Sequence, residues 1–593
     1  MFTKSGLDKL STQLFDDLPG LAPELLLCAG IVIMLLYRLL PRSRAHLSGI
    51  VFVVVALGFL AAFFNAGASQ GWFDGSLSPA NSLGIRNRSF NEAIFGRMIV
   101  LDHLTNFTRL VLFGFGLLVT WLSLLTGIPD AEDSADFYTL LLGGLLGMSL
   151  MASANHLLMV FIAIEMASLP SYALAGFLKG RRQSSEAALK YVVYGGGASG
   201  VMLYGISIIA GRFGTGYLPQ VCEALRMQLT AGATGGLYSP ENITVVLALV
   251  LIFVGLAFKL SAVPFHFWCP DVFEGAAAEV GAFLSVASKA AAMVLTGRLL
   301  LLLTGADVIA NPAMARNFGP AIAFFAAITA TFGNLAAYAQ TNLKRLLAYS
   351  TIAHAGYMMM GLAPMNSEGL AAVLFYLASY VFMNLGAFAI VALLRNKTGS
   401  EDLSSFRGLV YRSPLLVILL AVFLLSLLGL PPLVGFAAKF QVFSVLFKAG
   451  NTYAATSPRM SYTMYALLVV GGINTVFSVF YYLKVLKVMV LDRPVEEMEG
   501  QPASPINISI GATVYGLFLG ALVFAGGLAW NPLSAASTQG TKDFEGVIMG
   551  SPNDNAGAAP PIGGIGQPKG AGQPKGGQLK GGQPKGGVQP KEK

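Results

Sequence analysis

Cysteine and charge are both scarce in this sequence. The three cysteines among 593 residues, Cys28, Cys222 and Cys269, do not have the spacing of a metal-binding or disulfide motif. The sequence therefore gives no case for an iron–sulfur cluster, a zinc site or a disulfide framework. Any redox chemistry in which this chain takes part is expected to be carried by other subunits.

Charged residues make up only 11% of the chain, whereas hydrophobic residues make up 55%. A membrane-spanning helix needs about 20 mostly apolar residues, so this balance is typical of a polytopic membrane protein. The net charge of +8 does not indicate nucleic acid as a partner. Six lysines and one glutamate from Gln567 onward supply five of those eight charges.

Apolar runs of spanning length predict an all-α polytopic membrane protein with about fourteen transmembrane helices. The runs lie near 21–40, 46–65, 99–126, 136–153, 156–178, 186–211, 243–267, 276–304, 318–340, 343–363, 367–394, 414–448, 461–490 and 506–530. From Ser551 the chain is rich in proline, glycine, glutamine and lysine, and it repeats the sequence GQPKG. Such a segment cannot bury enough apolar surface to offset its ordering entropy, so we expect it to be disordered.

Lysine and arginine concentrate in alternate loops, for example at Arg38, Arg181 and Arg182. Positively charged loops remain on the cytoplasmic side of a membrane. We therefore expect a multi-pass protein of the bacterial plasma (inner) membrane, with these loops on the cytoplasmic side. An even number of helices then places both termini outside the cytoplasm.

Two lysines, Lys259 and Lys289, lie inside consecutive apolar runs, and Pro264 lies between them. A charged side chain at the centre of a membrane costs about 2.5–3.5 kcal/mol on insertion scales, so such residues are usually functional. A buried lysine can take up and release a proton near neutral pH. The pattern predicts a proton relay. His266, two residues after Pro264, is a further relay candidate that would link the lysines through water.

Glu165 lies near the centre of the fifth run, and Lys190 lies in the first turns of the sixth. The functional interpretation makes them an ion pair that changes with protonation. The alternative for Lys190 is an end-of-helix lysine paired with Glu186, four residues earlier. His354 lies inside the tenth run and is another relay candidate.

A second proline break suggests an internal repeat. Val254–Phe267 and Leu427–Phe440 are apolar segments that each contain a break, at Pro264 and at Pro431-Pro432, and a nearby lysine. Proline removes a backbone hydrogen bond, which is tolerated at membrane depth only where protein or water fills the site. Corresponding breaks in two halves are typical of transporters, and they add Lys439 to the relay candidates.

Five segments together resemble a known family. They read IEMASLPSYALAG, EAALKYVVYGGGASG, FKLSAVPFHFWCPDVFEGA, SVASK and AYSTIAHAGYMMMG. Over roughly Ile99 to Leu491, the chain resembles subunit N (the mitochondrial subunit 2 type) of respiratory complex I, the NADH–quinone oxidoreductase. That family is related to the membrane subunits of multisubunit cation/proton antiporters.

The resemblance implies an antiporter-like fold with two inverted five-helix repeats, discontinuous helices and a chain of charged residues at the membrane midplane. By motif, the family's glutamate falls on Glu165 and its lysines on Lys190, Lys259, Lys289 and Lys439. The expected division is 1–126 for the first helices, 127–304 and 305–491 for the two repeats, 492–535 for the last helix and 536–593 for the tail.

The resemblance also implies a function. The chain is expected to be a proton-translocating subunit of complex I that binds no cofactor itself. NADH, FMN, iron–sulfur clusters and quinone would belong to the whole complex, and the partners would be its other membrane subunits, the peripheral redox arm and the lipid bilayer. The alternatives are a subunit of a cation/proton antiporter that works without NADH, and a scaffold that does not pump.

Overall fold

The computed structural model describes Phe15 and residues 17–39, 47–69, 92–129, 133–231, 239–305, 313–494 and 505–544. These residues belong to one compact unit, Met1–Ile548. The GQPKG repeats lie outside the described residues, so their disorder stays a prediction.

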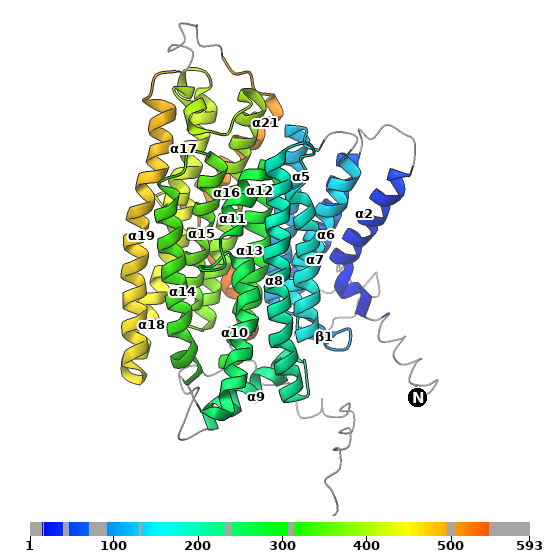
Figure 1. Cartoon of the computed structure of the whole chain (residues 1–593), viewed down its shortest axis with the longest axis vertical. Coiled ribbons are helices and arrows are strands. Elements are labelled where there is room, and N and C mark those ends of the chain that lie inside the picture. Colours follow the sequence, from blue (N-terminus) through cyan, green and yellow to red (C-terminus); the bar gives the residue numbers. More distant parts are fainter. Residues whose placement is uncertain are drawn as a thin grey trace, which may run out of the picture. The chain divides into compact units, whose positions relative to one another are not determined.

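Long helices that run alongside one another dominate this unit, with α2 at one edge of the view and α19 at the other (Figure 1). The long helices are α2 (Ala22–Arg38), α3 (Leu47–Ser69), α5 (His103–Thr126), α6 (Ser134–Ser153), α7 (Leu157–Ala175), α8 (Arg182–Phe213), α10 (Pro240–Leu260), α13 (Lys289–Thr304), α14 (Ala313–Ala337), α15 (Leu343–Leu362), α16 (Ser367–Thr398), α17 (Pro414–Leu428), α18 (Val434–Thr456), α19 (Pro458–Val490) and α21 (Ile510–Leu528). The short elements are η1 (Leu18–Leu21), α9 (Leu218–Ala231), α11 (Trp268–Gly275), α12 (Ala278–Phe283), η4 (Leu284–Ser288), η5 (Leu403–Phe406), η6 (Leu409–Tyr411), α22 (Asn531–Gln539), η7 (Lys542–Phe544), and strands β1 (Glu92–Ile94) and β2 (Ile99–Leu101).

The all-α membrane architecture predicted from the sequence is confirmed. Twelve helices among the described residues are long and apolar enough to span a membrane. The tenth and twelfth predicted runs fall outside that set, because α15 contains Lys344, Arg345 and His354, and because α17 has only 15 residues before the break. The count of fourteen therefore stays a prediction.

Both predicted helix breaks are confirmed. Helix α10 ends at Leu260, and α11 begins only at Trp268. Helix α17 ends at Leu428, and α18 begins at Val434. Each first half ends in a left-handed residue, Ser261 with φ 55° and Gly429 with φ 91°. The left-handed conformation stops helical hydrogen bonding, and at Gly429 the missing side chain makes it inexpensive.

Two segments differ from the sequence prediction. The third apolar run was expected to be helical from residue 99, but Ile99–Leu101 is strand β2, antiparallel to β1. The helix α5 begins after it, with Asp102 as its N-cap. At the other end of the chain, part of the predicted tail is helical, because α22 and η7 continue to Phe544.

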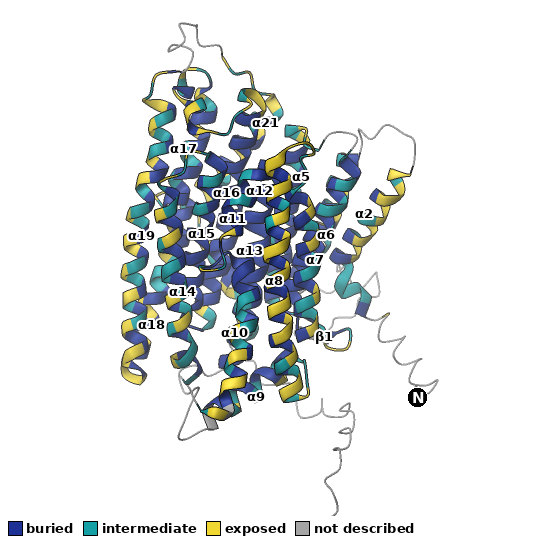
Figure 2. Cartoon of the chain, in the orientation of Figure 1, coloured by how far each residue is buried: buried dark blue, intermediate teal, exposed yellow. Residues whose placement is uncertain are grey.

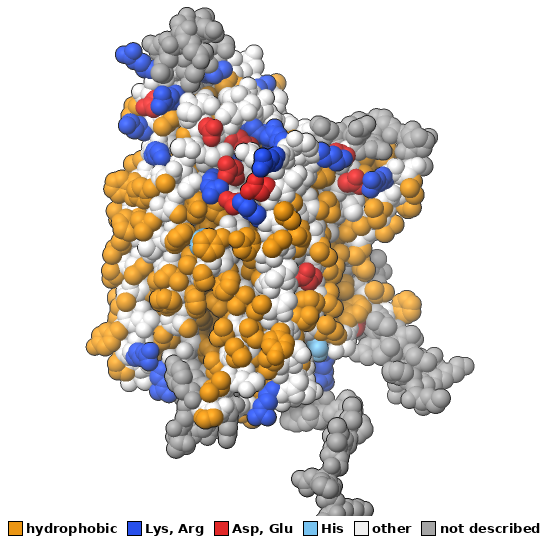
Figure 3. All heavy atoms as spheres, in the orientation of Figure 1, with side chains coloured by type: hydrophobic (Ala, Val, Ile, Leu, Met, Phe, Trp, Pro, Cys, Tyr) orange, Lys and Arg blue, Asp and Glu red, His pale blue; other side chains and the backbone are white. Residues whose placement is uncertain are grey.

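The buried side chains form the centre of the bundle, around α11, α12, α13, α15 and α16 (Figure 2). The outward faces of α8 and α19 carry exposed large apolar residues such as Val193 and Val469. The face drawn in Figure 3 has a broad apolar belt with charges gathered above and below it. An apolar exterior of this extent fits hydrocarbon chains as the surrounding medium.

Small residues set the distance between α14 and α15. A Cβ atom on Gly356 would lie 2.4 Å from the backbone nitrogen of Ala330, and one on Gly333 would lie 2.5 Å from that of Ala353. The two helices therefore approach each other backbone to backbone, as membrane helices do at small residues. Because α15 carries His354, this contact also positions a candidate relay residue.

Replacing Gly356 with valine is expected to remove most of the assembled protein, because the clash is with backbone and cannot be relieved by a side-chain rotation. The amount of the chain in washed membranes and in the intact complex on native gels measures this. Gly472→Val is the matched control, because a Cβ at Gly472 in α19 meets open space. Equal accumulation of the two variants would contradict the packing argument.

Candidate functional site

Lys259 and Lys289 are the two most strongly isolated cations in the core. They are 1% and 0% exposed, and neither Nζ atom has a hydrogen-bond partner among the described residues. Lys259 lies in the last turn of α10, just before the first break, and Lys289 follows the π-helical turn η4. Single π-helical turns occur frequently at functional sites. The two ammonium groups are close enough for their charges to interact.

Aromatic rings fill the space beside both ammonium groups. The Lys259 Nζ atom lies 5.9 Å from the centroid of the Tyr172 ring, and the Lys289 Nζ atom lies 5.6 Å from that of Trp268. Between them, Tyr191 stacks on Trp268 at 4.3 Å and meets Tyr172 edge-on at 4.7 Å. Ring faces attract cations without taking a proton from them. The rings therefore stabilise charged lysines while leaving their protons free to move.

The structure does not contain the Glu165–Lys190 pair proposed from the sequence. Lys190 Nζ binds Glu186 at 2.8 Å and Asp271 at 2.6 Å, so the alternative pairing with Glu186 is confirmed. Glu165 Oε1 is buried without a hydrogen-bond partner among the described residues. Its charge acts on Lys259 instead. The physical reason is that Asp271, on α11, places a carboxylate within hydrogen-bond distance of Lys190 at the polar end of the bundle.

Asp271 also connects Lys190 to the start of α15. Arg345 Nη1 lies 2.7 Å from Asp271 and 2.6 Å from Glu274. These residues join three elements, α8, α11 and α15. Side chains of both signs gather at the upper end of the apolar belt in Figure 3. An ion-pair network of this kind fixes the short helix α11 against its neighbours.

Lys439, just after the second break, and His354, in α15, form a second buried group. Lys439 Nζ donates a hydrogen bond to the Leu428 carbonyl at 2.9 Å and lies 4.6 Å from the Tyr357 ring centroid. The break at Pro431-Pro432 frees that carbonyl, which gives the lysine its partner. The two ring nitrogens of His354 contact the hydroxyls of Tyr376 (2.6 Å) and Tyr482 (3.2 Å). Lys439 and His354 are close enough to interact electrostatically.

Tyr380 and Cys269 are buried beside the two groups. The Tyr380 ring centroid is 5.1 Å from that of His354, and its hydroxyl donates to the hydroxyl of Thr351. Cys269 is 0% exposed and follows Trp268, whose ring centroid lies 5.6 Å from Lys289 Nζ. Tyr380 therefore extends the second group, and Cys269 adjoins the first.

His266 is buried in the turn between α10 and α11, and its side chain makes a poor bridge between the lysines. Its ring packs against Phe267 and Phe332, with centroid distances of 4.3 and 4.4 Å. Its Nδ1 atom has no hydrogen-bond partner among the described residues. Nothing in this arrangement links it directly to Lys259 or Lys289, so its relay role stays a prediction.

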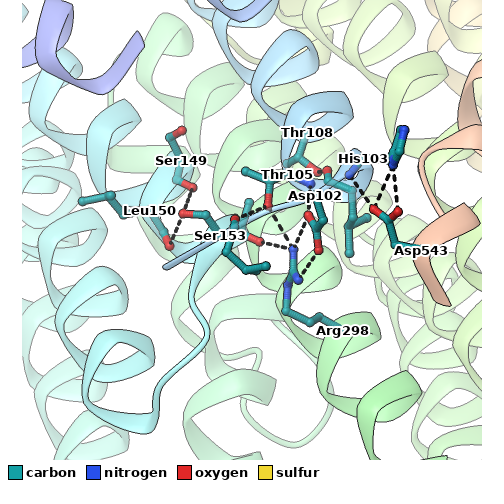
Figure 4. A network of polar contacts seen from close by, with 12 residues as sticks. Asp102, His103, Thr105, Thr108, Ser149, Leu150, Ser153, Arg298 and Asp543 are labelled. Carbon is teal, nitrogen blue, oxygen red and sulfur yellow. Dashed lines mark hydrogen bonds and ion pairs between the residues drawn. The ribbon is translucent and has the colours of Figure 1, made fainter. Parts of the chain in front are cut away.

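Two buried groups did not appear in the sequence interpretation. Glu279 is 0% exposed in α12, and neither of its carboxylate oxygens has a hydrogen-bond partner among the described residues. It lies inside the eighth apolar run, so the rule that selected Glu165 would have selected it too. Arg298 lies in the same run and binds Asp102, as Figure 4 shows.

The Arg298 network lies at the end of the bundle where α5 begins. Figure 4 shows the guanidinium facing the Asp102 carboxylate, with His103 turned toward Asp543. The His103 Nδ1 atom lies 2.9 Å from both carboxylate oxygens of Asp543. This contact joins η7 to α5, which explains why part of the predicted tail is ordered.

Comparison with known proteins gives one consistent answer. The family model described as NADH:quinone oxidoreductase/Mrp antiporter, TM, matches residues 154–463. NADH-quinone oxidoreductase subunit N 2 of Sorangium cellulosum (strain So ce56) is 38% identical over 521 residues, covering 86% of this chain and 95% of that protein. This chain belongs to the subunit N family of NADH-quinone oxidoreductases.

Solved structures agree with this family. A chain of respiratory complex I from Thermus thermophilus with bound aureothin is 30% identical, with a TM-score of 0.64, over 87% of this chain and 99% of that one. A chain of the Mrp complex from Dietzia sp. DQ12-45-1b has a TM-score of 0.71 at 19% identity, over 90% of this chain and 98% of that one. The second likeness shows the fold alone. The resemblance to subunit N stated from the sequence is therefore confirmed, and so is the antiporter-like fold.

Proposed function

We propose that protons cross the membrane through this subunit N chain along the row Lys259, Lys289, His354 and Lys439. The observation that carries this proposal is the pair Lys259 and Lys289, which are fully buried without a hydrogen-bond partner among the described residues. Burying an amine with no partner is costly, and apolar residues would pack there more cheaply. A scaffold without proton transport would gain nothing from keeping them.

Glu165 is the residue that couples the row to the rest of the complex. Its charge acts on Lys259, while its neighbour on the next helix, Lys190, is held by Glu186 and Asp271. If Lys190 moved from Asp271 to Glu165, the carboxylate would be neutralised and Lys259 would lose a stabilising charge. Lys259 would then release its proton toward Lys289 more readily.

The energy for that switch comes from electron transfer between NADH and quinone in partner subunits. FMN, iron–sulfur clusters and quinone belong to those subunits, including the peripheral arm. The energy of electron transfer reaches this chain only as a conformational change. Membership of the subunit N family supports this assignment over a free-standing cation/proton antiporter, because the similarity to the Mrp complex chain is a similarity of fold alone.

Both termini are proposed to lie outside the cytoplasm. Asp17, near the start of the described chain, accepts a hydrogen bond from the backbone nitrogen of Phe95 in the β1–β2 hairpin. Asp543, near its end, binds His103. The two described ends therefore lie at the same end of the bundle, opposite the ion-pair network of Lys190, Asp271 and Arg345.

Replacing Lys259 and Lys289 with alanine, singly, tests the proposed path. Each variant complex is expected to assemble and to oxidise NADH with an artificial electron acceptor, while NADH-driven proton uptake into proteoliposomes falls. Loss of a positioned proton-transfer group slows a reaction by about 10²-fold or more. Lys448→Ala is the control, because that side chain is 63% exposed and pairs only loosely with Glu368. Full proton stoichiometry in either alanine variant would exclude the path.

A further inference from the structure

Glu279 has an environment that no structural role explains. It is 0% exposed, and neither carboxylate oxygen has a hydrogen-bond partner among the described residues. A buried polar group without hydrogen bonds costs free energy, and a buried charge costs more. Gly281, two residues later, already packs directly against Phe388, so the helix does not need a carboxylate for contact with α16.

One cation that interacts with Glu279 is Lys344, in the first turn of α15. Lys344 is itself only 1% exposed, and its Nζ atom donates to the Ala276 carbonyl at 2.6 Å, three residues before Glu279. The lysine therefore anchors the chain immediately before α12 and holds its charge beside the Glu279 carboxylate.

Lys344 also connects Glu279 to the polar end of the bundle. Its Nζ atom lies 2.9 Å from Glu401 Oε1, and the Glu401 side chain is 13% exposed, more than that of Lys344 at 1%. Arg395, 7% exposed, adds a second cation to this group and acts on Lys344. The exposed fraction of the side chain thus decreases from Glu401 through Lys344 to Glu279.

In the opposite direction, Glu279 leads along its own helix to Lys289. Ten residues of helix span about 15 Å, which is too far for direct proton transfer. Ser285 lies on the intervening segment and accepts a hydrogen bond from Asn384 Nδ2 of α16. Asn384 Oδ1 is buried and has no partner among the described residues. These groups supply polar positions where water can bridge the gap.

We propose that Glu279 is a proton-carrying residue that loads Lys289 from the end of the bundle where Lys344 and Glu401 lie. In the loading step an N–H bond of the Lys344 ammonium breaks, its proton passes through a bridging water, and an O–H bond forms on the Glu279 carboxylate. The Lys344 amine then recovers a proton from the Glu401 carboxyl group, which has taken it up from hydronium in the solvent. The proton on Glu279 passes through bridging water to Lys289. This inference rests on the proposed path and adds its uptake side.

The test compares Glu279→Gln with Glu279→Asp in the whole complex. Glutamine keeps the shape but cannot release a proton, so NADH-driven proton uptake into proteoliposomes is expected to fall about tenfold or more, with artificial-acceptor activity unchanged. Aspartate keeps the carboxyl group and is expected to restore uptake with a displaced pH profile. Glu368→Gln is the control, because that carboxylate is 56% exposed on α16.

The outcomes separate this inference from the path itself. Wild-type uptake in Glu279→Gln, beside failed uptake in Lys289→Ala, would overturn the role of Glu279 and leave the path intact. Wild-type uptake in Lys289→Ala would overturn both. If Glu279→Gln does not assemble, Glu279→Asp decides alone, because an unchanged pH profile in that variant would mean that residue 279 carries no proton.

Discussion

Replacing Arg298 with alanine is expected to destabilise the protein by about 3–5 kcal/mol, because it leaves a buried carboxylate without its cation. The side chains of Arg298 and Asp102 are only 3% and 2% exposed. Arg298 Nη2 also donates to the Thr105 hydroxyl and the Ala152 carbonyl, each at 3.0 Å. One side chain thus joins α13 to the start of α5 and the end of α6.

The charge state of Asp102 depends on this arginine. Burial raises the pKa of Asp102, but the charge and hydrogen bonds of Arg298 outweigh burial and hold that pKa below its ordinary value. A carboxyl group with a depressed folded pKa contributes stability above its unfolded pKa and loses it as the pH falls through the folded value. Without Arg298, only the hydrogen bonds of Thr105 still oppose the effect of burial, so this acid-side dependence should weaken.

The Arg298 prediction is checked on the purified complex during heating. The measured quantity is the temperature at which half of this subunit has dissociated from the complex. Arg459→Ala is the matched control, because Arg459 is exposed at the start of α19. The double variant Arg298→Met with Asp102→Asn should recover most of the loss, since asparagine still caps α5 and no buried charge remains. A single variant as stable as the control would show that the pair contributes nothing.

The sequence predicts the fold here because two simple signals are strong. Runs of about 20 apolar residues place the helices, and Pro264 and Pro431-Pro432 place the breaks within a few residues. The strand β2 was not predicted, because Ile99–Leu101 is as apolar as the helix that follows. Its partner β1, Glu92–Ile94, lies in a mixed segment without strand alternation. Pairing between strands depends on contacts that the pattern of one segment does not contain.

The sequence predicted which residues belong to the site, but it did not predict which of them pair with one another. An ionisable residue inside an apolar run is visible from the sequence, and Lys259, Lys289 and Lys439 are buried as expected. The partner of Lys190 was not visible, because Asp271 is 81 residues away and lies on a short helix created by the break. Partner choice is a property of tertiary packing, and only the structure supplies it.

The aromatic lining of the row has the same origin. Tyr172, Tyr191 and Trp268 come from α7, α8 and α11, and each reads as an ordinary apolar residue in its own segment. Packed together, they form a ring stack between two ammonium groups. The lining of the proposed path therefore depends on tertiary packing, as the pairing of Lys190 does.

Lys439 gives the sharpest test of whether these lysines transfer protons or only supply charge. It is 4% exposed, and its Nζ atom has the Leu428 carbonyl as hydrogen-bond acceptor. Lys439→Arg keeps a positive charge, but a guanidinium does not release its proton in proteins. Lys439→Met keeps the volume and loses both. Both variants are expected to assemble, and both are expected to lose NADH-driven proton uptake by about 10²-fold or more.

Proton uptake and NADH–quinone electron transfer measured on the same proteoliposomes distinguish the two roles. If Lys439 transfers protons, arginine fails as completely as methionine. If arginine supports wild-type uptake while methionine does not, then the charge at this position is sufficient, and the last proton transfer bypasses residue 439. In that case His354, whose ring nitrogens contact Tyr376 and Tyr482, becomes the terminal group of the row, because it is the other member of the proposed path that interacts with Lys439.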